Sequence, residues 1–399
     1  MWHRAFVASG NDYRLRCNRR AFMRLGATLT LGAPLAGPWS RALGQQSTLS
    51  SQARSQAAVA VVPCKTYGPE NKAALRQCFD LIGGVEKLVR GKTVTIKINL
   101  TGTNFTPYLG RPAGETYITH GATVMALLAL LFEAGATRAR LVESTQSQAG
   151  LEDSLSDAGW DLNALGALGK VEYENTRNLG HGNSYSTLRV PFGGYMFSSL
   201  DLNHSYHDTD VMISLAKLKR HLTAGVTLSM KNLFGITPNS LYGAQAGSEK
   251  ATEGRQPLHE PGGYEKLKFP GLKPDATSRD PFARVPRIIV DACAARPIDL
   301  AIIDGISAMT GGEGPWCAQA ADIHYVAPGV LIAGRNAVST DAVATAIMGY
   351  DPRAPRRTRP FDHGDNFLLL AEQAGLGAAD LSQIEIRGLS LEKARHPYG

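Results

Sequence analysis

The chain has 399 residues, of which 43% are hydrophobic and 19% are charged, so it can bury a substantial core. This composition excludes disordered and fibrous proteins. The formal net charge of +7 does not indicate a nucleic-acid partner, because residues 1–44 hold seven arginines against one acidic residue and leave a charge of only +1 for the remainder.

Residues 1–44 have the features of an export signal. Residues 18–24 read Asn-Arg-Arg-Ala-Phe-Met-Arg, which resembles the twin-arginine signal, and residues 42–44 are a small-x-small cleavage site. The weakly apolar run at residues 25–35 is too short for a stable membrane span. We therefore expect a signal peptide read by the twin-arginine export machinery, and a periplasmic or otherwise exported protein. The alternative is a chance arginine pair before an amphipathic helix.

Residues 45–57 are rich in Ser and Gln and are expected to form a linker. Beyond them, apolar runs alternate with stretches of helical periodicity. Strands are expected at residues 93–98, 140–143, 210–215, 300–303, 330–333 and 384–386. Helices are expected at residues 119–134, 154–159, 286–295, 339–348 and 367–374. This alternation favours one large α/β domain over residues 58–399, in one lobe or two, whose mostly parallel sheet carries helices on both faces.

Residues 238–283 differ from the rest of this domain. They are rich in Gly, Pro and charge and show little periodicity. We expect a long irregular insertion there, which serves as a lid or an oligomer contact.

Four cysteines follow residue 44, namely Cys64, Cys78, Cys293 and Cys317. None lies in a CxxC or ferredoxin-type run, so we expect no iron–sulfur cluster in this chain. In an oxidising compartment, Cys64 with Cys78 or Cys293 with Cys317 are candidate disulfides. Buried free thiols are an equal alternative.

Polar residues recur where the expected strands end. They are Lys97, Asn99, Glu143, Lys217, Lys219, His221 and Asp304. Ligands of open parallel sheets bind at the carboxyl ends of the strands. Lys97, inside an apolar run, needs either an anionic ligand or an internal carboxylate such as Glu143 or Asp304. The pattern predicts a pocket for a small anionic molecule, a carboxylate or a phosphate.

Lys231 and His221 are the candidate catalytic residues of this pocket. Lys231 lies between the apolar residues Met230 and Leu233, which predicts a half-buried amine with a lowered pKa that can act as a base. The expected substrate-binding residues are Lys97, Asn99, Lys217, Lys219, Asn232 and Gly314. Glu143 and Asp304 would orient these groups or hold a divalent metal as cofactor. The alternative is a solvated basic face without a ligand.

The loop that follows Asp304 is rich in glycine and runs to Pro315. Such a loop suits a metal, a sugar hydroxyl or a phosphate, and a tight turn without ligand is the alternative. It is neither a Walker loop nor a dinucleotide fingerprint. No metal site built on histidines is expected, because His204 and His207 have no predicted helix beneath them. Asp341 is expected in the first turn of its helix, where the helix dipole favours a carboxylate.

These segments, in this order, resemble the family known as domain of unknown function 362. The matching segments are residues 97–100, 132–136, 210–213, 217–221, 227–235, 304–306, 314–315, 341–344 and 348–352. The Lys-x-Lys-x-His segment and the Met-Lys-Asn-x-Phe-Gly segment are specific. The resemblance implies no settled reaction. Many relatives carry a ferredoxin-like module with two clusters, which implies redox work, and this chain departs from them because it has no cysteine-rich segment.

Three functions fit these observations. The first is an exported enzyme that acts on a small anionic substrate through Lys231 or His221. The second is a periplasmic protein that binds a ligand or cofactor without turnover. The third is a redox-associated protein that works with a separate electron carrier. We favour the enzyme.

Overall fold

The computed structural model describes residues 58–103, 105–260, 268–276, 280–317 and 322–399. The expected signal peptide, residues 1–44, and the expected linker, residues 45–57, lie outside the described residues. The described residues belong to one compact unit.

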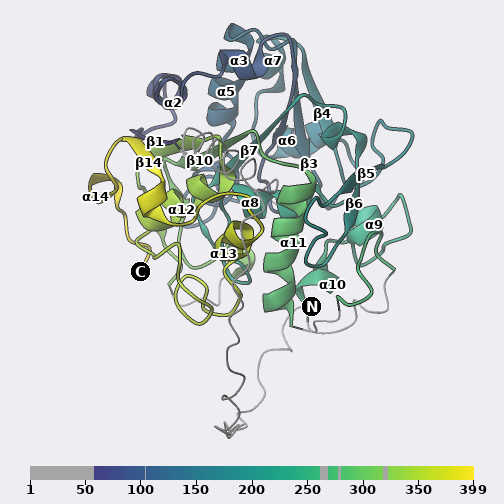
Figure 1. Ribbon diagram of the computed structural model, residues 1–399. Coiled ribbons are helices and arrows are strands. Elements are labelled where there is room, and N and C mark those ends of the chain that lie inside the picture. Colours follow the sequence, from purple (N-terminus) through teal and green to yellow (C-terminus); the bar gives the residue numbers. More distant parts are fainter. Residues whose placement is uncertain (1–57, 104, 261–267, 277–279, 318–321) are drawn as a thin grey trace, which may run out of the picture. The chain divides into compact units, whose positions relative to one another are not determined.

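An eight-stranded sheet forms the centre of this unit (Figure 1), with the strand order β14-β1-β13-β10-β7-β2-β3-β4. Its strands are β1 Ala58–Pro63, β2 Thr93–Lys97, β3 Arg138–Glu143, β4 Val171–Asn175, β7 Val211–Lys217, β10 Leu300–Gly305, β13 Val330–Gly334 and β14 Glu385–Gly388. All neighbouring strands are parallel except that β13 is antiparallel to both β1 and β10. The predicted mostly parallel sheet is confirmed.

Helices cover both faces of the sheet, as predicted (Figure 1). One face packs against α2 Glu70–Leu81, α3 Glu86–Val89, α4 Ala113–Thr116, α5 Gly121–Glu133, α6 Leu151–Asp157 and α7 Leu162–Gly166. The other packs against α8 Leu228–Asn232, α11 Pro281–Ala295, α12 Ala337–Ile347 and α13 Phe367–Gln373. Side chains alternate along each strand, so Val59 and Val61 enter one core while Ala60 and Val62 enter the other.

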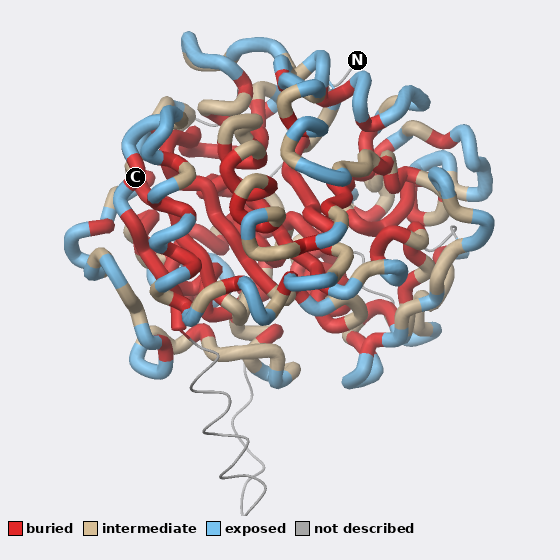
Figure 2. Tube along the Cα trace, turned by 90° about the horizontal axis from the view of Figure 1, so that it is seen from above, coloured by how far each residue is buried: buried red, intermediate tan, exposed pale blue. Residues whose placement is uncertain are grey.

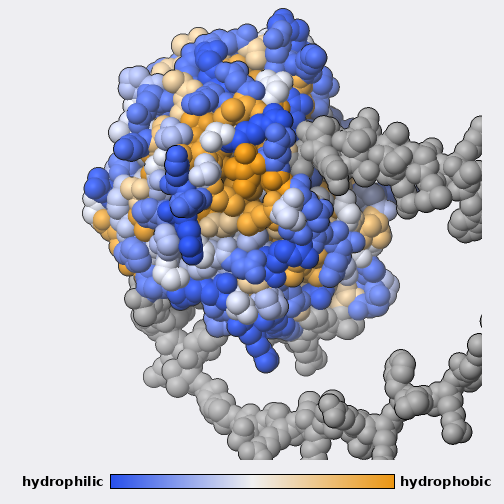
Figure 3. All heavy atoms as spheres, turned by 60° about the vertical axis from the view of Figure 1, so that its left-hand side comes forward, coloured by the Kyte–Doolittle hydropathy of each residue, from blue (hydrophilic) through white to orange (hydrophobic). Residues whose placement is uncertain are grey.

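Buried residues fill the interior and exposed residues lie around them (Figure 2), and the central strands β7, β10 and β13 are buried along their whole length. On one face of the molecule, apolar side chains also reach the surface within a hydrophilic surround (Figure 3). None of the described helices is both long enough and apolar enough to cross a membrane.

Helix α5 shows how the side chains set an element's limits. Its buried face contains Val124, Leu127 and Leu131, spaced as a helix requires. The helix begins after His120, whose imidazole accepts the N–H of Ala122 at 3.1 Å. Thr119, where we expected this helix to begin, instead accepts the backbone N–H of Asn99 and donates to the Leu215 carbonyl, so it ties the segment after β2 to β7.

Several elements lack a clear pattern in the sequence. Strands β1 and β4 and helix α2 were not predicted, and three short strand pairs lie outside the main sheet. These pairs are β5 Ser186–Arg189 with β6 Ser199–Leu202, β8 Arg220–His221 with β9 Gly225–Val226, and β11 Ala308–Met309 with β12 Tyr325–Val326. In the described parts of residues 238–283 there are two one-turn helices, α9 Asn239–Tyr242 and α10 Gln256–His259, and the start of α11. The chain ends after the short helix α14 Leu391–Ala394.

The four cysteines of the described chain are buried free thiols, so neither candidate disulfide forms. Burial raises the pKa of the Cys64 thiol to about 11, and that of the Cys317 thiol to about 12. These thiols are therefore protonated near neutral pH and serve as small apolar residues.

Candidate functional site

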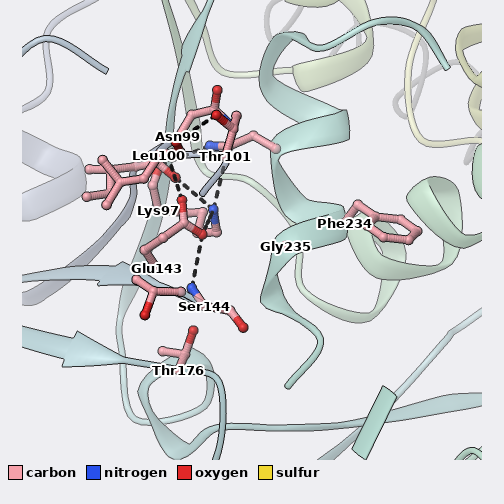
Figure 4. Close-up of polar contacts among 12 residues, drawn as sticks. Lys97, Asn99, Leu100, Thr101, Glu143, Ser144, Thr176, Phe234 and Gly235 are labelled. Carbon is pink, nitrogen blue, oxygen red and sulfur yellow. Dashed lines mark hydrogen bonds and ion pairs between the residues drawn. The ribbon is translucent and has the colours of Figure 1, made fainter. Parts of the chain in front are cut away.

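Lys97, at the end of β2, lies in a closed polar network (Figure 4). Its Nζ is 2.6 Å from Glu143 Oε1, and it donates to the Ile98 carbonyl at 2.7 Å and to Asn232 Oδ1 at 3.2 Å. Gly235 allows this packing, because a Cβ there would be 3.1 Å from the Nζ. Burial lowers the pKa of Lys97, and the Glu143 carboxylate opposes that change. The internal ion pair, which was the alternative to a substrate contact, is what the structure shows.

Asn232 and Asn99 belong to the same network. The Asn232 amide donates to the Lys97 carbonyl at 3.0 Å and to Ser214 Oγ at 3.1 Å. Its oxygen also accepts from Asn99 Nδ2 at 3.2 Å. Asn232 therefore joins α8 to the sheet, while Asn99 Oδ1 is buried without a hydrogen-bond partner among the described residues.

Lys217, at the end of β7, pairs with Asp304 at the end of β10. Its Nζ is 3.1 Å from Asp304 Oδ2, and it donates to the Tyr67 hydroxyl and the Gly114 carbonyl at 2.6 Å each. The Tyr67 ring stacks on His120 with a centroid distance of 3.6 Å. Lys217 is fully buried and has three partners, so it stabilises the fold and offers no free charge to a substrate.

The expectation that Glu143 and Asp304 hold one metal ion needs correction. Strands β7 and β2 lie between β10 and β3, which separates the two strand ends by roughly 14 Å. Each carboxylate is bonded to its own lysine. Within the described residues, no group of three or more His, Cys, Asp or Glu side chains is arranged to hold a metal. These two residues therefore cannot share an ion.

Lys219 is buried between two backbone carbonyls. Its Nζ donates to the Tyr117 carbonyl at 2.5 Å and to the Glu313 carbonyl at 2.9 Å. Burial lowers the pKa of Lys219 to about 7, although the charge of Glu313 opposes the change. No carboxylate of the described chain is within ion-pair distance of it, so its charge is only partly compensated.

Lys231 differs from the other three lysines. It is the only residue of α8 that is not fully buried, and its side chain makes no hydrogen bond or ion pair with any described residue. Its Nζ lies 4.6 Å from the centre of the Phe234 ring. Burial lowers the pKa of Lys231 to about 8, and the Glu313 carboxylate opposes this. The prediction of a half-buried lysine with a lowered pKa agrees with this environment.

Helix α8, which carries Lys231, is held by Asp341. The carboxylate of Asp341 accepts the N–H of Ser229 at 2.9 Å, its hydroxyl at 2.5 Å, and the N–H of Met230 at 2.8 Å. Asp341 thus binds the first turn of α8, whereas we expected it in the first turn of its own helix. Burial raises the pKa of Asp341 to about 7, and the three hydrogen bonds act in the opposite direction.

His221 and His259 bring two neutral imidazoles to Lys231. His221 Nδ1 accepts the N–H groups of Thr223 at 3.1 Å and Ala224 at 3.2 Å, so its ring proton is on Nε2. His259 Nδ1 lies 3.0 Å from the Arg255 carbonyl and must donate to it, which leaves a lone pair on Nε2. Burial, followed by the charge of Lys231, lowers the pKa of both rings, that of His259 to about 3.

Glu313 completes this arrangement. Its Oε1 is 3.8 Å from His221 Nε2, and its Oε2 accepts the N–H of Leu222 at 3.1 Å. Gly314, which we expected to bind substrate, packs against Trp316 instead, because a Cβ at Gly314 would be 2.3 Å from the indole. We refer to Lys219, His221, Lys231, His259 and Glu313 together as the Lys231 site.

Of the residues predicted for the pocket, Lys219, His221 and Lys231 lie together in the Lys231 site. Lys97 and Lys217 do not belong to this site. His259 and Glu313 were not predicted as site residues. His259 lies in the irregular segment 238–283, where no pattern singles it out. Glu313 directly precedes Gly314 in the glycine-rich loop, and this proximity was the only signal for it in the sequence.

A separate cavity of about 460 Å³ lies beside β4. It is lined by Arg138, Arg140, Glu152, Val171, Glu172, Tyr173, Glu174, His181 and His204. Its two arginines are paired with Glu172 at 3.4 and 3.2 Å. It shares no residue with the Lys231 site.

A family model described as domain of unknown function (DUF362) matches residues 94–346, which is more than half of the chain. Among curated proteins, a thylakoid-associated protein of Synechocystis sp. is 28% identical over 283 residues, which are 70% of this chain and 70% of that protein.

Two solved structures show a weaker likeness. The lactate racemase apoprotein of Thermoanaerobacterium thermosaccharolyticum matches with a TM-score of 0.37 and 12% identity, over 74% of this chain and 58% of that one. A protein of Thermotoga maritima matches with a TM-score of 0.32 and 13% identity, over 63% of this chain and 52% of that one. This chain thus spans little more than half of either, and neither likeness bears on its chemistry.

Proposed function

The chain belongs to the family described as domain of unknown function (DUF362), and from that premise we propose that it is an enzyme that binds a small anion at the Lys231 site. The anion is a carboxylate or a phosphate. Lys231 holds its charge, and Lys231 or His221 transfers a proton to or from it.

One observation carries this proposal. Lys97 and Lys217 each have a bonded carboxylate, whereas Lys231 is a partly exposed residue whose amine has no bonded acid in the described chain. Placing a cation at such a position is costly unless an anion compensates it. The nearby Lys219 adds a second charge without an ion pair among the described residues.

The hydrogen bonds around the site support acid–base chemistry. With its pKa lowered to about 8, the Lys231 amine is mostly protonated at pH 7 and gives up its proton within reach of neutral pH. His221 offers a donor at Nε2, and His259 offers a lone pair at Nε2. Lys231 Nζ and the His259 ring centre lie 4.6 and 4.8 Å from the centre of the same Phe234 ring, so a cation and an imidazole with a free lone pair both contact this ring.

Native mass spectrometry of the folded, full-length chain tests the binding step. We expect a bound small anion in the wild type and its loss in Lys231→Met, with Lys92→Met as control because Lys92 is likewise partly buried and lies outside the Lys231 site. Equal retention in both variants contradicts the proposal, as does a wild type that carries no anion and binds neither added phosphate nor added acetate.

The variant Lys231→Arg distinguishes an enzyme from a protein that only binds its ligand. It retains a cation, so it should keep the anion and lose turnover. Unchanged turnover of the retained anion would assign the chemistry elsewhere.

We also propose that the chain is exported by the twin-arginine route. The support is the order of three features within residues 1–44, which are the paired arginines, the weakly apolar run and the small-x-small site. This proposal is independent of the chemistry at Lys231.

A further inference from the structure

Two of the three exposed large apolar side chains in the described part of the chain adjoin Glu313. Trp316 is 52% exposed and Leu222 is 43% exposed, while the third, Phe192, is 37% exposed. The N–H of Leu222 donates to Glu313 Oε2, and Trp316 follows Glu313 by three residues on the same loop. The two segments that meet at the Glu313 carboxylate therefore each carry an exposed apolar residue.

The indole of Trp316 has a defined orientation. It packs edge-to-face on Tyr117 with ring centroids 5.9 Å apart, and it lies so close to Gly314 that no Cβ would fit between them. The carbonyl of the same Tyr117 accepts the Nζ of Lys219 at 2.5 Å. The elements that hold Lys219 in the site thus also hold the exposed ring. A rigid aromatic surface loses little entropy when a ligand packs on it.

We propose that Trp316 and Leu222 form an apolar rim of the Lys231 site, and that the site takes an anion carrying an apolar ring in preference to a small anion. The inference rests on the proposed function, because the Lys231 amine holds the charged end of this ligand. Trp316 stacks on the ring, and Leu222 covers its edge.

The arrangement favours a small ligand over a protein partner. A stable protein interface buries about 800 Å² on each partner, and two side chains beside a charged site offer much less. Cationic and apolar groups side by side instead match a ligand with one charged end and one apolar end. If Trp316 and Leu222 bound a protein partner instead, they would not increase the affinity for such ligands.

Isothermal titration calorimetry on the full-length chain at pH 7 tests the rim with three probes. Acetate carries charge alone, phenylacetate carries charge and ring, and phenylacetamide carries the ring alone. We expect phenylacetate to bind about tenfold more tightly than acetate, and phenylacetamide to bind most weakly. Equal affinities for phenylacetate and acetate would overturn the rim and leave the proposed function intact. Absence of binding by all three would overturn both.

Matched variants locate the effect. Trp316→Ala should reduce phenylacetate affinity about tenfold and leave acetate affinity unchanged. Phe192→Ala removes an aromatic ring of similar exposure and should change neither. Phenylacetate binding that survives in Trp316→Ala, or falls equally in Phe192→Ala, would overturn the assignment of the rim.

Discussion

The Nε2 atom of His221 lies 3.8 Å from Glu313 Oε1, and the N–H of the next residue in the chain donates to the other oxygen of the same carboxylate. This contact joins the β8–β9 hairpin to the glycine-rich loop. Glu313 is also the acid whose charge counters the effect of burial on both Lys219 and Lys231. The Glu313 carboxylate therefore acts on the pKa of two lysines, neither of which forms an ion pair in the described chain.

Removal of this carboxylate should shift the pH range of anion binding. In Glu313→Gln the Lys231 amine loses the negative charge that most opposes the lowering of its pKa by burial, so it deprotonates at lower pH than in the wild type. We expect the upper pH limit of phosphate binding to move down, as measured by calorimetry across pH 6–10. A limit that stays in place or moves up would show that Glu313 does not act on Lys231.

In the wild type, anion affinity should decline as pH rises through the pKa of Lys231, which is about 8. Only the protonated amine attracts an anion, so above this pH we expect the anion affinity to fall by a factor approaching ten per pH unit. Acetate, whose charge does not change in this range, separates the titration of the amine from that of phosphate. Lys231→Arg should remove the slope, because a guanidinium stays charged throughout. A decline that persists in Lys231→Arg would assign the titration to another group.

Lys219 should make stability depend on pH. Its pKa is lowered to about 7 in the folded protein, so between that value and 10.5 the unfolded chain binds more protons than the folded chain. The free energy of unfolding therefore rises with pH in this window. We expect urea denaturation to show that Lys219→Met raises the free energy of unfolding relative to the wild type most strongly near pH 7. This difference should shrink toward pH 10. A difference that grows with pH would contradict the assignment.

The ion pair between Lys97 and Glu143 should matter for stability. Removing one partner leaves a buried charge without compensation, so Lys97→Met and Glu143→Gln should each lower the free energy of unfolding by about 3 kcal/mol. The double variant should be more stable than the sum of the two losses implies. Urea denaturation measures all three. Additive losses, or single losses below about 1 kcal/mol, would mean that the pair contributes little.

Replacement of both Arg19 and Arg20 by lysine should keep the precursor in the cytoplasm, because the twin-arginine machinery reads the pair. Cell fractionation with an antibody against the mature domain measures this. Replacement of Arg14 and Arg16 by lysine provides a control with the same change in composition. Equal export of both variants would rule out the proposed route.

The α/β class and the sheet edge could be predicted because apolar strands and periodic helices are local patterns. Lys97 and Lys217, which we expected in one pocket, do not share one. Lys97 aligns with Ser214 on β7, and Lys217 lies three residues further, so the two lysines point to opposite faces of the sheet. A single run of sequence does not reveal which face a residue at a strand end will take.

The ion-pair partners of the lysines could not be predicted from local sequence patterns either. Lys217 pairs with Asp304 because β7 and β10 are neighbours, although 87 residues separate them in the chain. His259 reaches Phe234 from a segment without periodicity. By contrast, the lowered pKa of Lys231 could be predicted, since its main cause is burial and the apolar residues on either side of it indicated that burial.

The account depends most on the Lys231 amine being free to hold an anion. Calorimetric titration of phosphate into the wild type, Lys231→Met and Lys92→Met at pH 7 addresses this directly. We expect similar binding to the wild type and to Lys92→Met, and at least a tenfold loss in Lys231→Met. Phosphate affinity that is equal in all three proteins would show that the amine binds no anion and would contradict the account.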